Sequence, residues 1–140
     1  MGAAPTTAAL TVGGTTLNPG MSDAYELYQQ GSKLLEEGFF NQATIPLAKA
    51  RDLEPDKTSI REALGRAYFR SHQFERAREE FEAVVERAPT NDYALFCLGR
   101  SLMQLGLPGE ARRPLAQAAS LRPDRRDYRI YRDRARAAAA

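Results

Sequence analysis

The sequence predicts an all-α protein in which three copies of a helical hairpin stack into an α-solenoid. The first observation is that glycine, alanine and proline recur at intervals of 34 residues, a period typical of helical repeats. The second is that apolar residues within each copy follow helical spacing. The third is that 140 residues contain one cysteine and one histidine, too few for an intrachain disulfide or a cysteine-built zinc site. We therefore expect no metal and no cofactor.

Residues 1–21 are predicted to form a flexible tail, and residues 22–140 the repeat domain. Residues 1–20 carry no charged side chain, and they lack the basic start and continuous apolar stretch of a secretory signal. Asn18, Pro19 and Gly20 form a turn signal that separates the tail from the repeats. Because no run of 18 apolar residues exists, we expect no membrane association and a cytoplasmic location.

The repeats are predicted over residues 24–57, 58–91 and 92–125. Five series of residues keep the 34-residue register through all three copies: Gly31, Gly65, Gly99; Ala43, Ala77, Ala111; Leu47, Phe81, Leu115; Ala50, Val84, Ala118; and Pro55, Pro89, Pro123.

Each repeat is predicted to contain two helices. In the third repeat Leu95, Leu98 and Leu102 form the apolar stripe of the first helix, and a break at residues 106–109 precedes the second. The corresponding breaks lie at Gly38 and at residues 71–72, and the recurring proline closes each pair. A glycine inside a helix costs about 1 kcal/mol relative to alanine. Its threefold recurrence therefore indicates a close approach between the paired helices, which we expect the alanine series to meet.

This pattern resembles the tetratricopeptide repeat, whose signature is W-x2-L-G-x2-Y, then A-x3-F, then P. The second repeat matches it best, through Leu64, Gly65, Tyr68, Ala77, Phe81 and Pro89. The signature tryptophan is absent, and its positions hold Leu27, Arg61 and Leu95. The resemblance covers 102 of the 140 residues, and it implies a right-handed superhelix of three helical hairpins.

Residues 126–140 are predicted to form a C-terminal capping helix. Tyr128, Tyr131 and Ala135 give it a narrow apolar stripe, and the other positions are mainly charged. Repeat arrays need such an atypical polar element at an open end.

The resemblance also implies that the first helix of each repeat lines a concave groove. A groove that combines aromatic residues with arginine suits a peptide carrying apolar and acidic residues, since arginine pairs with carboxylates. We therefore interpret the protein as a non-catalytic adaptor or scaffold. The alternative is that Leu35, Phe69 and Met103 only fill space between helices. The candidate groove residues are Tyr25, Tyr28, Ser32, Leu35, Arg66, Phe69, Arg70, Tyr93, Phe96, Arg100 and Met103.

Members of this family that hold the acidic tails of heat-shock chaperones use lysine, asparagine and arginine in the groove. At the matching places this chain has Tyr28, Ser32, Ala63, Tyr93 and Cys97. We therefore expect a protein or peptide partner other than a chaperone tail.

A second interpretation is contact with nucleic acid or a ribonucleoprotein through the C-terminal helix. Residues 122–140 hold seven arginines against three aspartates, a net charge of +4, and tyrosines that could stack on bases. A solvated capping helix with paired arginines explains the same residues. The candidate basic surface is Arg125, Arg126, Arg129, Arg132, Arg134 and Arg136.

The charge is unevenly distributed along the chain. Residues 21–57 hold seven acidic and four basic side chains, a net charge of −3, against +4 at the C-terminal end. This polarity favours weak head-to-tail self-association. An enzyme is the least favoured class, because the sequence contains no H-E-x-x-H, G-x-S-x-G or G-x-x-x-x-G-K-[ST] motif.

Overall fold

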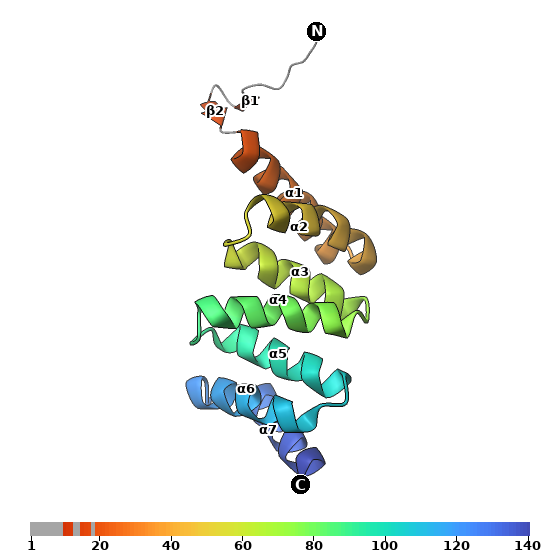
Figure 1. Cartoon of the computed structure of the whole chain (residues 1–140), viewed down its shortest axis with the longest axis vertical. Helices are drawn as coiled ribbons and strands as arrows, with labels where there is room; N and C mark the ends of the chain where they lie inside the picture. Colours follow the sequence, from red (N-terminus) through yellow and green to blue (C-terminus); the bar gives the residue numbers. More distant parts are fainter. Residues whose placement is uncertain (1–9, 13–14, 18) are drawn as a thin grey trace.

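The computed structural model describes residues 10–12, 15–17 and 19–140, and within these residues the chain forms two short strands and seven helices (Figure 1). The elements in order are β1 (Leu10–Val12), β2 (Thr15–Leu17), α1 (Pro19–Glu36), α2 (Phe40–Leu53), α3 (Thr58–Arg70), α4 (Phe74–Arg87), α5 (Asp92–Gln104), α6 (Pro108–Leu121) and α7 (Arg126–Ala139).

The N-terminal segment contains structure that the sequence does not predict. Strands β1 and β2 pair antiparallel, with Leu10 opposite Leu17. Helix α1 begins at Pro19, three residues before the predicted start of the repeat domain. A proline suits this position because the first turn of a helix leaves its N–H groups without helical partners. The predicted flexible tail otherwise falls on residues 1–9, 13–14 and 18, which lie outside the described residues.

Helices α1 to α6 form the three predicted hairpins, and α7 follows them. Each helix packs mainly against its neighbours in sequence, so the hairpins stack in chain order, with α1 and α7 at opposite ends (Figure 1). This is the all-α solenoid that the 34-residue period predicts. Among the helices described, none combines the length and the apolar character needed to cross a bilayer.

The recurring glycines give each hairpin its close contact. A Cβ atom at Gly31 would lie 2.3 Å from Leu47 Cγ, at Gly65 2.8 Å from Phe81 Cζ, and at Gly99 2.3 Å from Leu115 Cγ. The predicted close approach is therefore confirmed, but the neighbour that needs the space is the large apolar residue of the second helix. The side chain nearest to each glycine is thus not the alanine but the leucine or phenylalanine four residues after it.

The turn inside each hairpin uses a left-handed residue at one repeated place. Gly38 has φ 86°, Gly106 has φ 74°, and His72 takes the same place in the second repeat with φ 63°. A left-handed conformation costs about 1–2 kcal/mol for a residue with a Cβ atom. His72 is therefore held there by the two helices that it joins.

A buried carboxylate distinguishes the second repeat. Glu80, only 4% exposed, stands where the other repeats have Pro46 and Pro114. Its Oε1 is 3.0 Å from Arg61 Nη1, and its Oε2 is 2.5 Å from Arg51 Nη1. Burial lowers the pKa of Arg51, but the hydrogen bond and charge of Glu80 raise it above its ordinary value overall. Arg61, at the place of the signature tryptophan, thus gains a charged partner.

The two ends of the solenoid are closed in different ways. At the N-terminal end, α1 exposes polar residues at positions whose equivalents in α3 are buried and apolar: Glu26 for Ile60, Gln30 for Leu64 and Lys33 for Ala67. At the C-terminal end, α7 covers α5 and α6. The Tyr128 ring stacks on Phe96 with centroids 4.5 Å apart, and its hydroxyl donates a hydrogen bond to Asp92 at 2.7 Å. Helix α7 is therefore the predicted cap.

Candidate functional site

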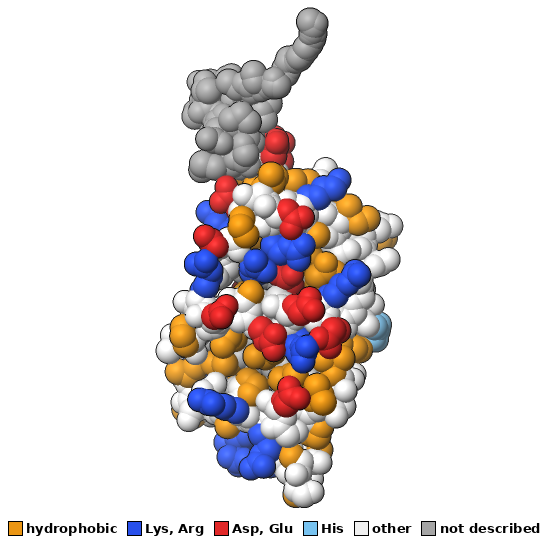
Figure 2. All heavy atoms as spheres, viewed as in Figure 1, with side chains coloured by type: hydrophobic (Ala, Val, Ile, Leu, Met, Phe, Trp, Pro, Cys, Tyr) orange, Lys and Arg blue, Asp and Glu red, His pale blue; other side chains and the backbone are white. Residues whose placement is uncertain are grey.

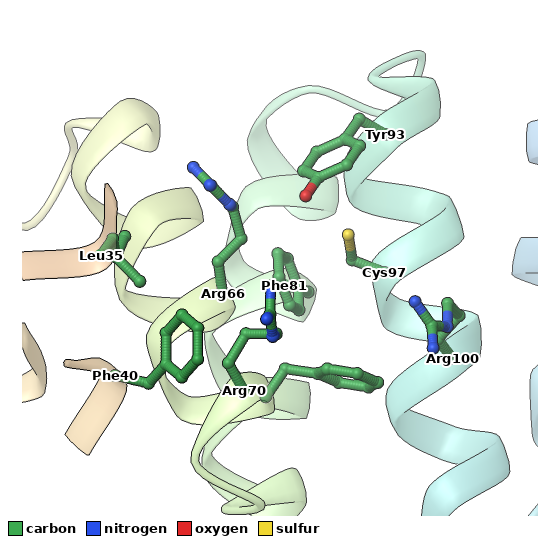
Figure 3. Close-up of a pocket in the computed structure, with 9 residues that line it drawn as sticks. Leu35, Phe40, Arg66, Arg70, Phe81, Tyr93, Cys97 and Arg100 are labelled. Carbon is green, nitrogen blue, oxygen red and sulfur yellow. The ribbon is translucent and has the colours of Figure 1, made fainter. Parts of the chain in front are cut away.

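A pocket of about 210 Å³ opens between α3 and α5, and its walls come from five helices (Figure 3). We name it the groove pocket. Helix α5 supplies three lining residues spaced by four and three, so they lie on one helical face. The lining residues are Leu35, Phe40, Arg66, Phe69, Arg70, Phe81, Tyr93, Cys97 and Arg100.

The structure brings six of the eleven predicted groove residues together in this pocket: Leu35, Arg66, Phe69, Arg70, Tyr93 and Arg100. Leu35 and Phe69 serve both interpretations, since they pack on the core and also line the pocket. The pocket also contains Phe40 and Phe81, which the sequence does not predict as groove residues. Phe81 belongs to a repeated series that looks purely structural, and Phe40 carries no pattern of its own.

The other five predicted residues lie outside the pocket. Tyr25 is 59% exposed on α1, and Ser32 is half-buried on the same helix. Tyr28 and Met103 are partly buried against the core. Phe96 is only 7% exposed, because α7 places Tyr128 and Tyr131 against it. Phe96 therefore belongs to the interface with the cap. Its helical spacing alone predicts a place in the groove, because the sequence does not show where α7 packs.

The three pocket arginines form no ion pair within the part of the chain that the structure describes, whereas Arg51 and Arg61 pair with Glu80. Aromatic rings hold two of them instead. The guanidinium carbon of Arg70 lies 4.2 Å from the centroid of the Phe40 ring. That of Arg100 lies 4.8 Å from the Phe69 ring and 4.7 Å from the Tyr131 ring. All three arginines therefore line the pocket without a carboxylate in ion-pair contact, and Glu62 is close enough for its charge to act on Tyr93 and Cys97.

Tyr93 and Cys97 contribute no charge at neutral pH. Burial raises the pKa of the Cys97 thiol to about 12, with a further increase from the charge of Glu62. Burial also raises the pKa of the Tyr93 hydroxyl, and its interaction with Cys97 adds to that. The pocket thus combines neutral and aromatic walls with three positive charges, a surface suited to an anionic group beside an apolar one.

Half of the predicted basic surface residues pair with nearby aspartates. Arg125 pairs with Asp127 at 2.8 Å, and Asp133 is 3.0 Å from Arg132 and 3.7 Å from Arg136. The hydrogen bond from Arg125 lowers the pKa of Asp127. Blue side chains still gather near the C-terminal end in Figure 2, while both signs alternate over the middle of this face. The pairing favours a solvated capping helix.

The remaining members of the predicted basic surface have no carboxylate partner in the described residues. Arg129 donates to the carbonyl oxygen of Pro123 at 2.5 Å, and Arg134 lies over the Tyr131 ring at 4.9 Å. Arg126 is exposed. These three residues supply three of the four net positive charges of residues 122–140, and the sharing of Asp133 by Arg132 and Arg136 leaves the fourth.

Stacked helical hairpins around a pocket that opens between their first helices define a helical-repeat protein with a binding face. A family model described as Tetratricopeptide repeat matches residues 28–92 and 62–126. The chain belongs to the tetratricopeptide repeat family.

Solved structures support this fold. The first such domain of Spaghetti (RPAP3), bound to the HSP90 peptide SRMEEVD, is 21% identical with a TM-score of 0.78, over 85% of this chain and 95% of that one. The Arabidopsis OM64 domain is 17% identical with a TM-score of 0.78, over 84% and 97%. The second domain of human RPAP3, in complex with the HSP70 peptide SGPTIEEVD, is 14% identical with a TM-score of 0.77, over 84% and 98%. No curated protein matches the chain in sequence.

Proposed function

We propose that the protein is a non-catalytic adaptor or scaffold that binds a peptide segment along its first helices, with the groove pocket as the central contact. The observation that carries this proposal is the pocket itself, in which phenylalanines lie beside three arginines that have no ion-pair partner in the described residues. Such a pocket suits a peptide with both apolar and acidic residues. Tyr93, 37% exposed, presents an aromatic ring at the surface of this pocket, and Tyr25, 59% exposed, presents another on α1 outside it.

The two RPAP3 structures bear on the nature of the peptide. They contain chaperone peptides that end in Glu-Glu-Val-Asp and that combine apolar with acidic residues. These comparisons do not support our expectation that chaperone tails are excluded. The observation behind that expectation still holds: Tyr28, Ser32 and Cys97 of this chain carry no positive charge at the groove positions concerned. Both peptides are therefore direct probes.

The experiment measures binding of fluorescent SRMEEVD, SGPTIEEVD and a panel of other acidic-apolar peptides by anisotropy. We expect Tyr93→Ala and Arg66→Gln to weaken capture of any peptide that binds by about tenfold each, because each removes an exposed contact worth roughly 1–2 kcal/mol. Arg112→Gln, on the exposed surface of α6 and outside the pocket, is the matched control and should leave binding unchanged.

Cys97 supplies an independent readout because it is the only cysteine of the chain and it lines the pocket. A peptide bound in the groove pocket should slow the reaction of this thiol with a disulfide reagent. Binding that survives both groove variants, or that leaves the thiol reaction rate unchanged, would place the peptide elsewhere and overturn the proposal.

A further inference from the structure

A second pocket adjoins the groove pocket at the turn between α3 and α4. We name it the turn pocket; its volume is about 440 Å³. Phe69, Arg70 and Arg100 line both pockets, so these three side chains form the partition between them. The turn pocket adds His72, Phe74 and Gln104. Neither lining contains an acidic residue, and the polar side chains around the partition are all hydrogen-bond donors.

The turn pocket is shaped by the left-handed backbone at His72. This conformation places the imidazole against Phe74, with ring centroids 5.5 Å apart at 86°. Phe74 in turn meets Phe69 edge-on at 5.2 Å. Phe69 therefore contacts both the Phe74 ring and the guanidinium of Arg100, and it helps to fix the position of that charge.

Ring stacking holds an arginine in a way that leaves it able to bind. A ring covers the face of the planar guanidinium, whereas the N–H groups point outward in its plane. The guanidinium carbon of Arg70 lies over the Phe40 ring at 4.2 Å, and that of Arg100 lies over the Phe69 ring at 4.8 Å and the Tyr131 ring at 4.7 Å. Among the guanidinium nitrogens of Arg70 and Arg100, only Nε of Arg100 is both shut off from solvent and without a partner in the described residues. Its terminal nitrogens, which make no hydrogen bond there, therefore remain open to a ligand.

We propose that Arg70 and Arg100 form a preorganised site for a doubly charged anionic group, either a phosphomonoester or two neighbouring carboxylates, carried by the peptide that occupies the groove. Two guanidinium groups match a dianion better than a single carboxylate, because one bidentate arginine already satisfies a single carboxylate. His72 and Gln104 add further hydrogen-bond donors at the edge of the same site. The inference rests on the proposed function only in naming a bound peptide as the carrier of the anion. The anion site itself does not depend on that function.

The test uses small probes, so that it does not depend on finding the peptide. The Nε–Hε resonances of Arg70 and Arg100 are followed by NMR at about pH 8, where a phosphomonoester is dianionic. The titrants are phenyl phosphate, phthalate and benzoate at constant ionic strength. We expect saturable shifts with phenyl phosphate or phthalate. Benzoate should bind about tenfold more weakly, because it loses one pair of charge-assisted hydrogen bonds. Tighter binding of phenyl phosphate assigns a phosphorylated side chain, and tighter binding of phthalate assigns neighbouring acidic residues.

Variants separate stacking from charge. Arg70→Gln and Arg100→Gln should each weaken dianion binding by about tenfold, and Arg100→Lys should do nearly the same, because lysine keeps the charge but loses the planar donors. Arg113→Gln, exposed on α6, is the matched control for charge. Arg70 is itself exposed, so Arg70→Gln keeps the test decisive if an Arg100 variant unfolds.

Three results would overturn the inference: no saturable shift with either dianion, benzoate binding as tightly as the dianions, or full binding by Arg100→Lys. Failure of the proposed function is a different result. In that case the dianions still shift both arginines, but no peptide protects the Cys97 thiol.

Discussion

At the scale of single residues, Cys97 shows how the pocket controls ionisation. Burial raises the pKa of its thiol to about 12, whereas an unfolded chain has a cysteine pKa of about 8.5. A group whose pKa is higher in the folded state contributes stability that is present in full below the unfolded pKa. That contribution is lost as the pH rises, because the unfolded thiol releases its proton while the folded thiol keeps it.

We therefore expect the free energy of unfolding of the wild-type protein to fall relative to that of Cys97→Ser above about pH 8.5, by at most about 1.4 kcal/mol per pH unit. Urea denaturation of both proteins between about pH 7 and pH 9.5, below the tyrosine pKa of about 10, measures this difference. A difference that is the same at every pH would show that the folded thiol titrates normally.

How far the sequence predicts the site is also decided residue by residue. Arg66, Arg70 and Arg100 are predicted because each is a charge at a helical position that the repeat turns toward the groove. Phe96 obeys the same spacing and yet lies under Tyr128, because its exposure depends on where α7 docks. Phe40 reaches the pocket through its ring contact with Arg70, and no spacing within one repeat encodes a contact between two repeats.

At the scale of elements, the hairpin turns separate backbone strain from packing. Gly106 has φ 74° and Gly109, the second residue of α6, does not have a positive φ, while a Cβ atom at either glycine would meet nothing within 4 Å. The two positions therefore differ in backbone conformation, and an added methyl group would meet no neighbour at either one.

We expect Gly106→Ala to destabilise the protein by about 1 kcal/mol, since alanine is strained in the left-handed region. Gly109→Ala should instead stabilise it by a few tenths to about 1 kcal/mol, because alanine favours the helix and restricts the unfolded chain. Thermal melts of the two variants beside the wild type test the opposite signs. Equal shifts in the same direction would contradict this account of the turns.

The elements themselves are well predicted where the period repeats them. Three copies of one pattern locate six helices and their turns, and the stripe of Tyr128 and Tyr131 locates the seventh in the part of the chain that the structure describes. Strands β1 and β2 have no second copy, and α1 extends beyond its repeat to Pro19, so neither feature has a period to reveal it. The 34-residue register predicts a turn at His72. The identity of the residue does not predict its left-handed conformation, because the other two repeats have glycine at this place.

At the scale of the whole molecule, the two ends of the solenoid carry opposite chemistry. Residues 21–57 have a net charge of −3, and the C-terminal residues from 122 have +4, at the end where Figure 2 shows the basic side chains gathering. The exposed residues Glu26 and Gln30 at one end and Arg126 and Arg134 at the other are polar, so charge can contribute to a contact between ends beside the exposed side chains of Tyr25 and Ile130.

We predict weak head-to-tail association that salt abolishes. Light scattering should show an apparent mass that rises with concentration at about 10 mM ionic strength, where the Debye length is about 30 Å, and not at about 150 mM, where it is about 8 Å. Charge reversal at Arg126 and Arg134 should remove the effect, and the same reversal at Arg112 and Arg113 on α6 is the control. Association that is unchanged by salt would indicate a hydrophobic interface instead.

The position of Arg100 has one further consequence for the molecule. Its guanidinium contacts the Phe69 ring of α3 and the Tyr131 ring of α7 while it lines both pockets. A ligand that binds only when Arg100 is seated between these rings must hold α7 in place, and a docked α7 must tighten that ligand by the same factor, since linkage is reciprocal. The capping helix and the pocket thus share one equilibrium, and amide exchange in α7 reports on pocket occupancy.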